Sequence, residues 1–215
     1  CALPIWDTSN PGTTTGLGAV VNINPTQGNS TVVHTPGGKS AELKSQFKVK
    51  FAAASLYTGS FGSLVGMNGA KIKFGRSFAS RPFALHGFFQ YAPVAVTHIG
   101  DNQPAGTLSK GDMDVCSIYI ALAKKQYTVD NTDTDTFIDF KGDNNIIAYG
   151  EVPVKECVST NGAWKEFTIN LEYKTQEKPG DMHLIIVASA SKYGDYFTGG
   201  DGSVLYVDDF ELIYD

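Results

Sequence analysis

The chain has 215 residues, and its 17 Lys and Arg against 22 Asp and Glu give a net charge of −5. This acidic balance argues against binding to a nucleic-acid backbone, which requires a basic face. An apolar content of 42% argues against disorder and provides a sizeable core, and 23 glycines with 12% aromatic residues favour strands and turns over helices.

Alternating polarity recurs along the chain and predicts strands with one buried face. The clearest case is the segment in which Phe167, Ile169 and Leu171 alternate with polar side chains. Clusters of Gly, Asn, Asp and Pro separate such segments, and no window of about 12 residues has the helical period. In chain order, strands are predicted at residues 19–23, 31–35, 39–51, 72–74, 83–91, 115–122, 146–152, 165–173, 182–190 and 203–214.

Many short strands without helices favour an all-β fold, a two-sheet antiparallel β-sandwich of the jelly-roll type. Residues 1–215 contain no linker and no change of composition, so a single domain is expected. Residues 57–64 resemble residues 197–204, and both are interpreted as Gly-rich turns that lead into strands.

The three cysteines are an odd number. Cys1 is either the acylated first residue of a mature bacterial lipoprotein or the start of a fragment. Cys116 is expected to be a small buried side chain, with a Cys116–Cys157 disulfide as the alternative. The longest apolar stretch, around residues 184–188, is far shorter than the ~20 residues that cross a bilayer, so no transmembrane segment is expected.

Segments along nearly the whole chain resemble one known family. Near the C-terminus, Gly194-Asp195-Tyr196-Phe197 opens a Gly-rich loop, and Asp208-Asp209 lies in the last strand. Other matching segments are Trp6-Asp7-Thr8-Ser9-Asn10, Ser40-Ala41-Glu42-Leu43, Arg81-Pro82-Phe83-Ala84-Leu85, Gln90-Tyr91, Lys110-Gly111-Asp112-Met113-Asp114 and Gly202-Ser203-Val204-Leu205. Together they resemble the putative carbohydrate metabolism domain family of gut bacterial surface proteins.

The resemblance implies a jelly roll similar to carbohydrate-binding modules, with an oligo- or polysaccharide as the partner. It also implies an exported protein, periplasmic or attached to the cell surface as an outer-membrane lipoprotein. Family members open with a Phe-Glu strand, often after another domain, and neither precedes Trp6 here. This favours Cys1 as a fragment start and implies an additional N-terminal domain in the parent protein.

The last strand carries the candidate metal site. Strict alternation places Asp208 on the same face as Phe210 and Leu212, and therefore inward. Jelly rolls with a similar Asp-Asp strand commonly hold a structural Ca²⁺, which takes six to eight oxygen ligands. The resemblance thus implies Ca²⁺ at Asp208 and Asp209; the alternative is that Asp208 binds turn amides or a lysine.

Aromatic side chains on sheet faces and in loops are the candidate carbohydrate-binding residues, because sugar C–H faces stack on flat rings while polar neighbours bind the hydroxyls. The alternative for each is packing at an edge of the core. The candidates are Trp6, His86, Tyr119, Trp164, Tyr193 and Tyr196.

Glu151, Glu166 and Glu172 are the candidate catalytic carboxylates, because a glycosidase needs two acidic groups across a cleft. Because glutamates are scarce and no acidic pattern repeats along the strands, catalysis by such a pair is the alternative hypothesis and not the main one. The sequence therefore predicts a non-catalytic domain for polysaccharide capture, with a glycoside hydrolase and a structural or adhesion module of a surface assembly as the rival hypotheses.

Overall fold

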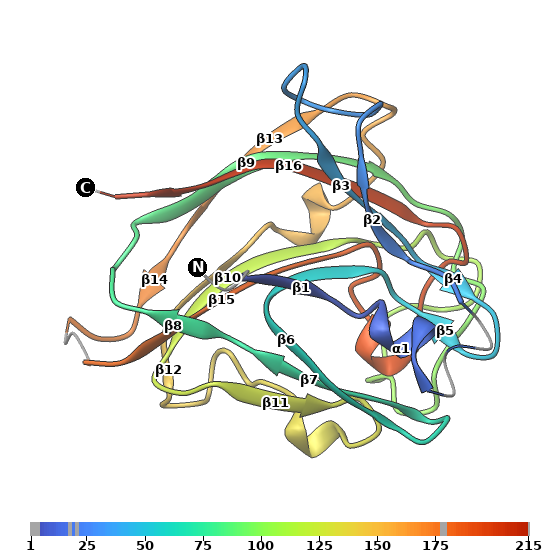
Figure 1. The fold of residues 1–215 in the computed structure, drawn as a ribbon, viewed down its shortest axis with the longest axis horizontal. Helices are drawn as coiled ribbons and strands as arrows, with labels where there is room; N and C mark the ends of the chain where they lie inside the picture. Colours follow the sequence, from blue (N-terminus) through green and yellow to red (C-terminus); the bar gives the residue numbers. More distant parts are fainter. Residues whose placement is uncertain (1–4, 17–18, 20–21, 177–179, 215) are drawn as a thin grey trace.

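The computed structural model describes residues 5–16, 19, 22–176 and 180–214, and it confirms the two-sheet antiparallel β-sandwich (Figure 1). The larger sheet has nine strands. Along its main path run β11 (Tyr127–Asp130), β7 (Gly69–Phe74), β6 (Ser55–Val65), β15 (Met182–Ser189), β10 (Ser117–Ala123), β12 (Ile146–Glu151) and β14 (Glu172–Tyr173), while β1 (Trp6–Thr8) pairs with β6 and β8 (Arg76–Phe78) pairs with β15.

The second sheet has five strands and lies above the first in Figure 1. Its order is β13 (Lys165–Asn170), β9 (Ala84–Ala92), β16 (Val204–Ile213), β3 (Ser40–Lys44) and β2 (Thr26–Asn29), and a separate hairpin pairs β4 (Gln46–Phe47) with β5 (Phe51–Ala52). The described helices are α1 (Pro11–Thr14) and the 3₁₀ turns η2 (Thr134–Thr136), η3 (Val154–Glu156) and η4 (Gly194–Tyr196). None of these helices has the length and apolar character needed to cross a membrane.

The main core lies between the two sheets. Ile118 and Ile120 of β10 and Phe89 and Tyr91 of β9 belong to this one cluster and are completely buried. The Tyr91 hydroxyl donates a hydrogen bond to the Ala190 carbonyl at 2.8 Å, so the buried polar group is satisfied. The predicted alternation of β10 is therefore confirmed on its inner face.

A second core lies on the opposite face of β10 and β15. The long strand β6 starts beside β15, with Tyr57 opposite Val187, and continues beside β7, with Gly59 opposite Phe74. The sheet thus curls beneath itself, and β7 and β11 cover Tyr57, Val187 and Ala121 (Figure 1). At the bend a Cβ on residue 59 would lie 2.1 Å from the Lys73 carbonyl oxygen, which only glycine avoids.

A β-bulge interrupts β16 between Asp208 and Glu211, and Asp209 has a left-handed φ of 51°. The extra residue reverses the alternation, because Val207 is buried before the bulge and Phe210 packs against the same core after it. The expectation that Asp208 points inward with Phe210 is therefore wrong. Asp208 lies on the outer face of the five-stranded sheet.

Two further expectations about elements are wrong. Residues 31–35 form the loop between β2 and β3 instead of a strand, and residues 57–64 lie within β6 instead of a turn. Part of the predicted strand 19–23, like Cys1, falls outside the described residues. Cys116 and Cys157 are free buried thiols, and a hydrogen bond from Cys116 lowers the pKa of Cys157.

Candidate functional site

A pocket with two lobes opens beside the β4–β5 hairpin. The apolar lobe has a volume of about 470 Å³ and extends toward β6, β7 and α1. The polar lobe has a volume of about 460 Å³ and is bounded by residues 98–102 and 131–134. Five residues line both lobes and form the junction between them: Lys50, Phe51, Asn131, Asp195 and Phe197.

The loop between β15 and β16 carries Asp195 and Phe197, and a buried carboxylate fixes this loop. Asp114 is 1% exposed. It accepts hydrogen bonds from the Ser191 hydroxyl at 2.7 Å, the Gly200 amide at 2.8 Å and the Ser203 hydroxyl at 2.9 Å. Burial raises the pKa of Asp114, and these donors oppose that rise. Both ends of the Gly-rich loop are thereby tied to the chain just before β10.

Asp195 is the one acidic residue at the junction. Its side chain is exposed to the space of the pocket, and no described residue donates a hydrogen bond to its carboxylate. Desolvation by the surrounding pocket walls raises the pKa of Asp195 to about 6. Because its oxygens receive no hydrogen bond from the described residues, this carboxylate can accept hydrogen bonds from a ligand.

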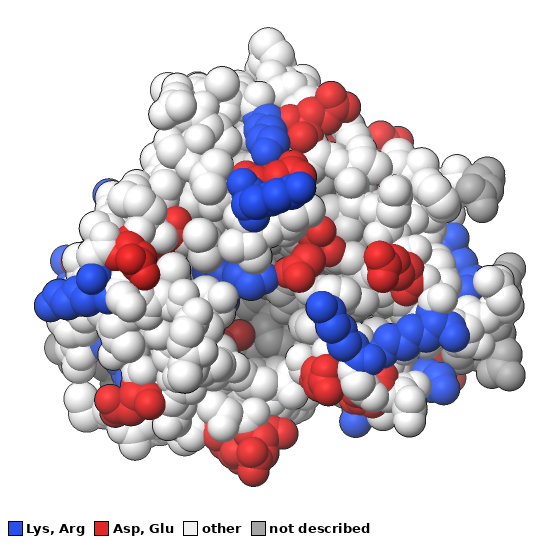
Figure 2. Space-filling view, turned by 180° about the vertical axis from the view of Figure 1, so that it is seen from behind, with Lys and Arg blue, Asp and Glu red and all other residues white. Residues whose placement is uncertain are grey.

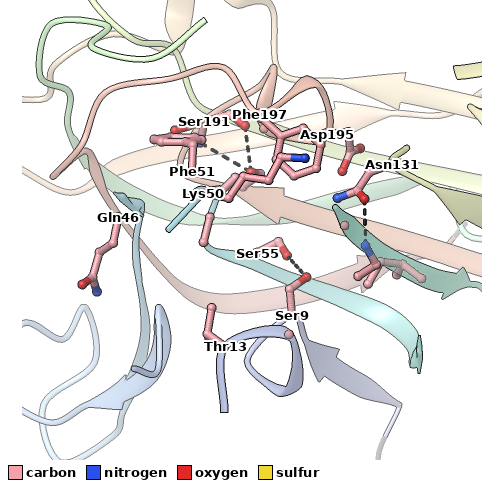
Figure 3. A pocket seen from close by; sticks show the side chains of 18 of the residues that line it. Ser9, Thr13, Gln46, Lys50, Phe51, Ser55, Asn131, Ser191, Asp195 and Phe197 are labelled. Carbon is pink, nitrogen blue, oxygen red and sulfur yellow. Dashed lines mark hydrogen bonds between the residues drawn. The ribbon is translucent and has the colours of Figure 1, made fainter. Parts of the chain in front are cut away.

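Lys50 belongs to the turn of the β4–β5 hairpin, and its side chain lines the junction. Its Nζ sits 3.6 Å from the centroid of the Phe197 ring (Figure 3) and donates a hydrogen bond to the Asn68 carbonyl. Desolvation lowers the pKa of Lys50, and the nearby charge of Asp101 opposes this. Asn131 accepts a hydrogen bond through Oδ1 from the Ala70 amide at 2.8 Å, which orients its amide group.

The polar lobe places aromatic rings beside polar groups. The His98 ring stacks on Phe47 with centroids 3.9 Å apart, and Phe51 lies 5.9 Å from the same imidazole. Tyr196 also lines this lobe. The polar groups on its wall are those of Asp101, Asn102, Asn131, Thr132, Thr134 and Asp195.

Close backbone packing forms one wall of the polar lobe. A Cβ on residue 100 would lie only 1.6 Å from the Tyr196 carbonyl oxygen. We expect Gly100→Ala to separate the two loops and lower the free energy of unfolding by about 2–4 kcal/mol, measured by chemical denaturation. Gly180→Ala is the matched control, because a Cβ there meets no atom of the described residues within 4 Å. Equal stability of the two variants would contradict the close approach of the loops.

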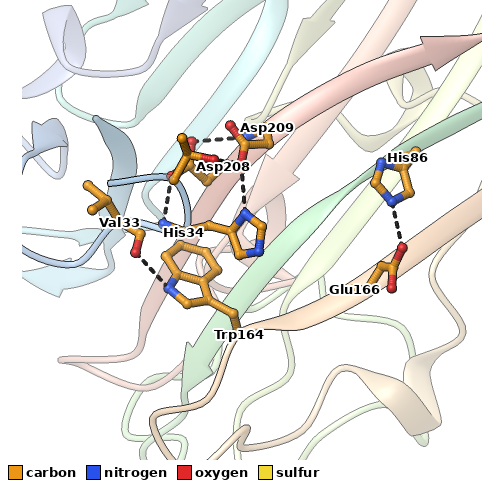
Figure 4. Close-up of polar contacts among 8 residues, drawn as sticks. Val33, His34, His86, Trp164, Glu166, Asp208 and Asp209 are labelled. Atoms are coloured by element: carbon orange, nitrogen blue, oxygen red, sulfur yellow. Dashed lines mark hydrogen bonds and ion pairs between the residues drawn. The ribbon is translucent and has the colours of Figure 1, made fainter. Parts of the chain in front are cut away.

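A second group of candidate residues lies on the outer face of the five-stranded sheet and is called the His34 cluster: His34, Phe88, Trp164, Asp208 and Asp209. Figure 4 labels His34, Trp164, Asp208 and Asp209 of this cluster. The His34 ring stacks on Phe88 at 3.5 Å, and Trp164 meets it edge-on. Trp164 donates its Nε1–H to the Val33 carbonyl at 3.1 Å. These contacts pin the β2–β3 loop onto the sheet.

The Asp208 and Asp209 carboxylates face hydrogen-bond donors. Asp208 accepts from the His34 amide at 2.9 Å, and Asp209 accepts from the Thr35 hydroxyl at 2.6 Å and pairs with His34 Nδ1 at 2.7 Å. A cation bound here would have to displace these donors, and the hydrogen bond from the His34 amide is of the kind expected for the alternative, in which Asp208 binds turn amides. In the described part of the chain, no three His, Cys, Asp or Glu residues are grouped to share a metal. The calcium site at these residues stays a prediction, checked by melting with EDTA or added Ca²⁺.

Asp209 is expected to stabilise the β2–β3 loop in a pH-dependent manner. Hydrogen bonds from Thr35 and then His34 lower the pKa of Asp209 below its usual value. Its contribution is therefore present above about pH 4 and is lost as the pH falls through the lower folded-state value. Near pH 6 we expect Asp209→Asn to cost on the order of 1 kcal/mol, with the difference vanishing in acid. Denaturation at both pH values measures this, and a difference that persists in acid would refute it.

The remaining predicted residues are dispersed. Tyr119 lines the apolar lobe and Tyr196 the polar lobe, whereas Tyr193 lines neither. Trp6 packs against Phe210 with ring centroids 6.0 Å apart, at the edge of the main core. His86 lies on the outer face of the five-stranded sheet and is bound to Glu166.

The three predicted glutamates do not share a cleft. Glu151 forms an ion pair with Lys192 at 2.7 Å, and Glu166 bonds His86 at 2.9 Å on the other sheet. Glu172 is exposed on β14, and none of the three lines either lobe. None of the five junction residues was predicted from the sequence as a site residue. Two of them, Asp195 and Phe197, lie in the Gly-rich loop segment that matched the family, which was the one signal that could have pointed to them.

Comparison with known proteins agrees with the sequence motifs. The family described as "putative carbohydrate metabolism domain" matches residues 2–213. The chain belongs to this family. No curated protein matches this carbohydrate metabolism domain.

Two solved structures share the fold of the domain. One is described as a putative glycoside hydrolase from Bacteroides thetaiotaomicron, with a TM-score of 0.75, 23% identity and coverage of 98% of this chain and 63% of that one. The other, described as a putative glycoside hydrolase from Bacteroides vulgatus, has a TM-score of 0.69, 24% identity and coverage of 97% and 85%. The domain thus spans less than two thirds of the first protein.

Proposed function

We propose that the polar lobe binds an oligo- or polysaccharide and that the domain captures glycans without cleaving them. The observation that carries this proposal is the Asp195 carboxylate, which receives no hydrogen bond from the residues that the structure describes and lies in a lobe lined by aromatic rings. Family membership supports a role in carbohydrate metabolism.

The lobe offers the chemistry that a sugar requires. The half-buried rings of Tyr196 and Phe197 provide apolar surface for the C–H faces of a pyranose. Asp195 and Asp101 accept hydrogen bonds from hydroxyls, and the Asn131 amide nitrogen donates to them. Lobes of this volume lie within the range of ordinary small-molecule sites, about 300–1,000 Å³.

A glycan array tests the proposal. We expect weak, selective binding with a Kd on the order of 10 µM to 1 mM, because solvated hydroxyls gain little net free energy from each new hydrogen bond. Binding by the purified domain to one glycan class, lost in Asp195→Ala, would support the proposal. Silence across plant, host and microbial glycans would overturn it.

A glycoside hydrolase is the second candidate, favoured by one observation. Asp195, whose pKa is raised to about 6, suits a general acid, and Asp101 lines the same lobe as a second carboxylate. Reducing-sugar release that disappears in both Asp195→Asn and Asp101→Asn would establish this activity. Binding without release would exclude it for the glycan tested.

The proposed setting is an exported domain of a polysaccharide-using bacterium, periplasmic or at the cell surface. Acidic and basic side chains are interspersed over the face seen in Figure 2, and that face is hollowed near its middle. Such a surface, in a chain of net charge −5, is compatible with a neutral glycan partner. Fractionation of cells that make the parent protein tests the location, and recovery in the cytoplasm would refute it.

A further inference from the structure

The apolar lobe has a lining that a sugar does not need. Apolar atoms form most of the surface of this lobe, with a floor made by the second core, although polar side chains such as Ser9, Thr13 and Gln46 also line it. The residues that the inference uses are Val49, Leu64, Met67, Ile72, Phe74 and Tyr119.

The apolar part of this lining is unsuited to sugar hydroxyls. A hydroxyl buried against Leu64, Ile72 or Phe74 would lose its water without gaining a hydrogen-bond partner, which is unfavourable. An apolar group entering the same space is removed from water, which is favourable. The lobe volume of about 470 Å³ is large enough for a ligand group larger than one methyl.

The two lobes meet at a polar junction. Lys50, Asn131 and Asp195 line both lobes, so a molecule held by them in the polar lobe can extend directly into the apolar lobe. Figure 3 shows Lys50, Asp195 and Phe197 on one side of the pocket, with Ser9 and Thr13 at the opposite end. The arrangement fits a ligand with one hydrophilic and one apolar part.

We propose that the apolar lobe binds an aromatic substituent, an aryl or aromatic acyl group, carried by the glycan whose sugar occupies the polar lobe. This inference rests on the proposed function for the sugar part of the ligand. Phe51, Phe74, Phe197 and Tyr119 supply rings for edge or stacked contacts, and Met67 supplies a polarizable thioether. An aromatic group therefore fits this lobe better than a plain sugar does.

A neutral aromatic probe tests the apolar lobe without any sugar. The fluorescence of N-phenyl-1-naphthylamine should increase on binding and saturate at one probe per chain. Val49→Glu combined with Met67→Glu should weaken this binding at least tenfold, because both residues line the lobe and are 60% and 66% exposed. The matched control is Val158→Glu with Met113→Glu, whose residues are 52% and 55% exposed and line neither lobe.

Paired 4-nitrophenyl and methyl glycosides then connect the two lobes. For the sugar that binds, the aryl glycoside should bind at least tenfold more tightly, and the Val49/Met67 variant should remove this gain. Absence of saturable probe binding, including through occupation of the lobe by another part of the chain, would overturn the inference. An equal loss of probe binding in the control variant would also overturn it, as would equal affinities for the aryl and methyl glycosides. Probe binding with no binding of any glycoside would overturn the proposed function instead.

Discussion

Replacing Asp195 with Asn is expected to weaken glycan binding by about 10- to 100-fold. Charge-assisted hydrogen bonds contribute roughly 1.5–3 kcal/mol, and each 1.4 kcal/mol is a factor of ten in affinity. Desolvation raises the pKa of Asp195 to about 6, so the wild-type affinity should rise between pH 5 and pH 7 as the carboxylate ionises. Isothermal titration calorimetry with the glycan identified on the array measures both effects.

The same substitution should stabilise the protein above pH 6. The folded-state pKa of Asp195 lies above the unfolded value, so the native state holds its proton longer as the pH rises. The ionisation of Asp195 therefore lowers the free energy of unfolding of the wild type between about pH 4 and pH 6, and this free energy stays reduced above that range. Because Asp195 opens into the pocket, we expect Asp195→Asn to gain only about 1 kcal/mol at pH 8 and nothing below pH 4.

Asp135→Asn is the matched control, because Asp135 is an exposed carboxylate that lines neither lobe. It should leave the glycan affinity unchanged. If Asp135→Asn weakens binding as much as Asp195→Asn does, net charge is the cause and the assignment of Asp195 fails.

Replacing Asp114 with Ala is expected to have the largest effect on stability. The substitution leaves the Gly200 amide and the Ser191 and Ser203 hydroxyls without their acceptor in a buried site. Each unsatisfied buried donor costs roughly 1–3 kcal/mol, and partial reorientation of the hydroxyls gives a total of about 4 kcal/mol. For a chain of this length the loss corresponds to a fall in Tm of about 10 °C, measured by calorimetry.

Asp112→Ala provides the comparison in the same loop. Asp112 is exposed and accepts one hydrogen bond, from the Ser109 amide at 2.7 Å, so its loss should cost less than about 1 kcal/mol. If the two variants melt together, Asp114 does not fix the Gly-rich loop. A stable Asp114→Ala protein that no longer binds glycan would instead show that Asp114 acts only by positioning that loop.

Local alternation predicted the strands whose two faces have different surroundings. In β13, Phe167 and Ile169 face the core while Thr168 and Asn170 are exposed, as the sequence indicates. The prediction was wrong in β6, where glycines lie within the strand and allow the backbones of β6 and β7 to approach closely. It was also wrong in β16, where the bulge at Asp209 reverses the alternation. Both failures depend on neighbouring strands that lie far away in the sequence.

The pocket was harder to predict than the fold. Its junction joins Lys50 of the hairpin, Asn131 after β11 and Asp195 before β16, and no spacing in the sequence connects them. Trp164 was selected for its ring and its polar strand neighbours, yet its indole serves to hold the β2–β3 loop. Residue type alone does not separate a ring that binds a ligand from one that packs against a loop.

The position of the second core has a consequence for hydrogen exchange. Ile72, Phe74 and Val187 belong to this core and also form the floor of the apolar lobe. A ligand that binds the lobe only while these strands are folded stabilises them by RT ln(1 + L/Kd), where L is the free ligand concentration. Amide protons of β7 and β11 should then exchange more slowly with bound ligand, while those of β9, in the main core, should keep their rates.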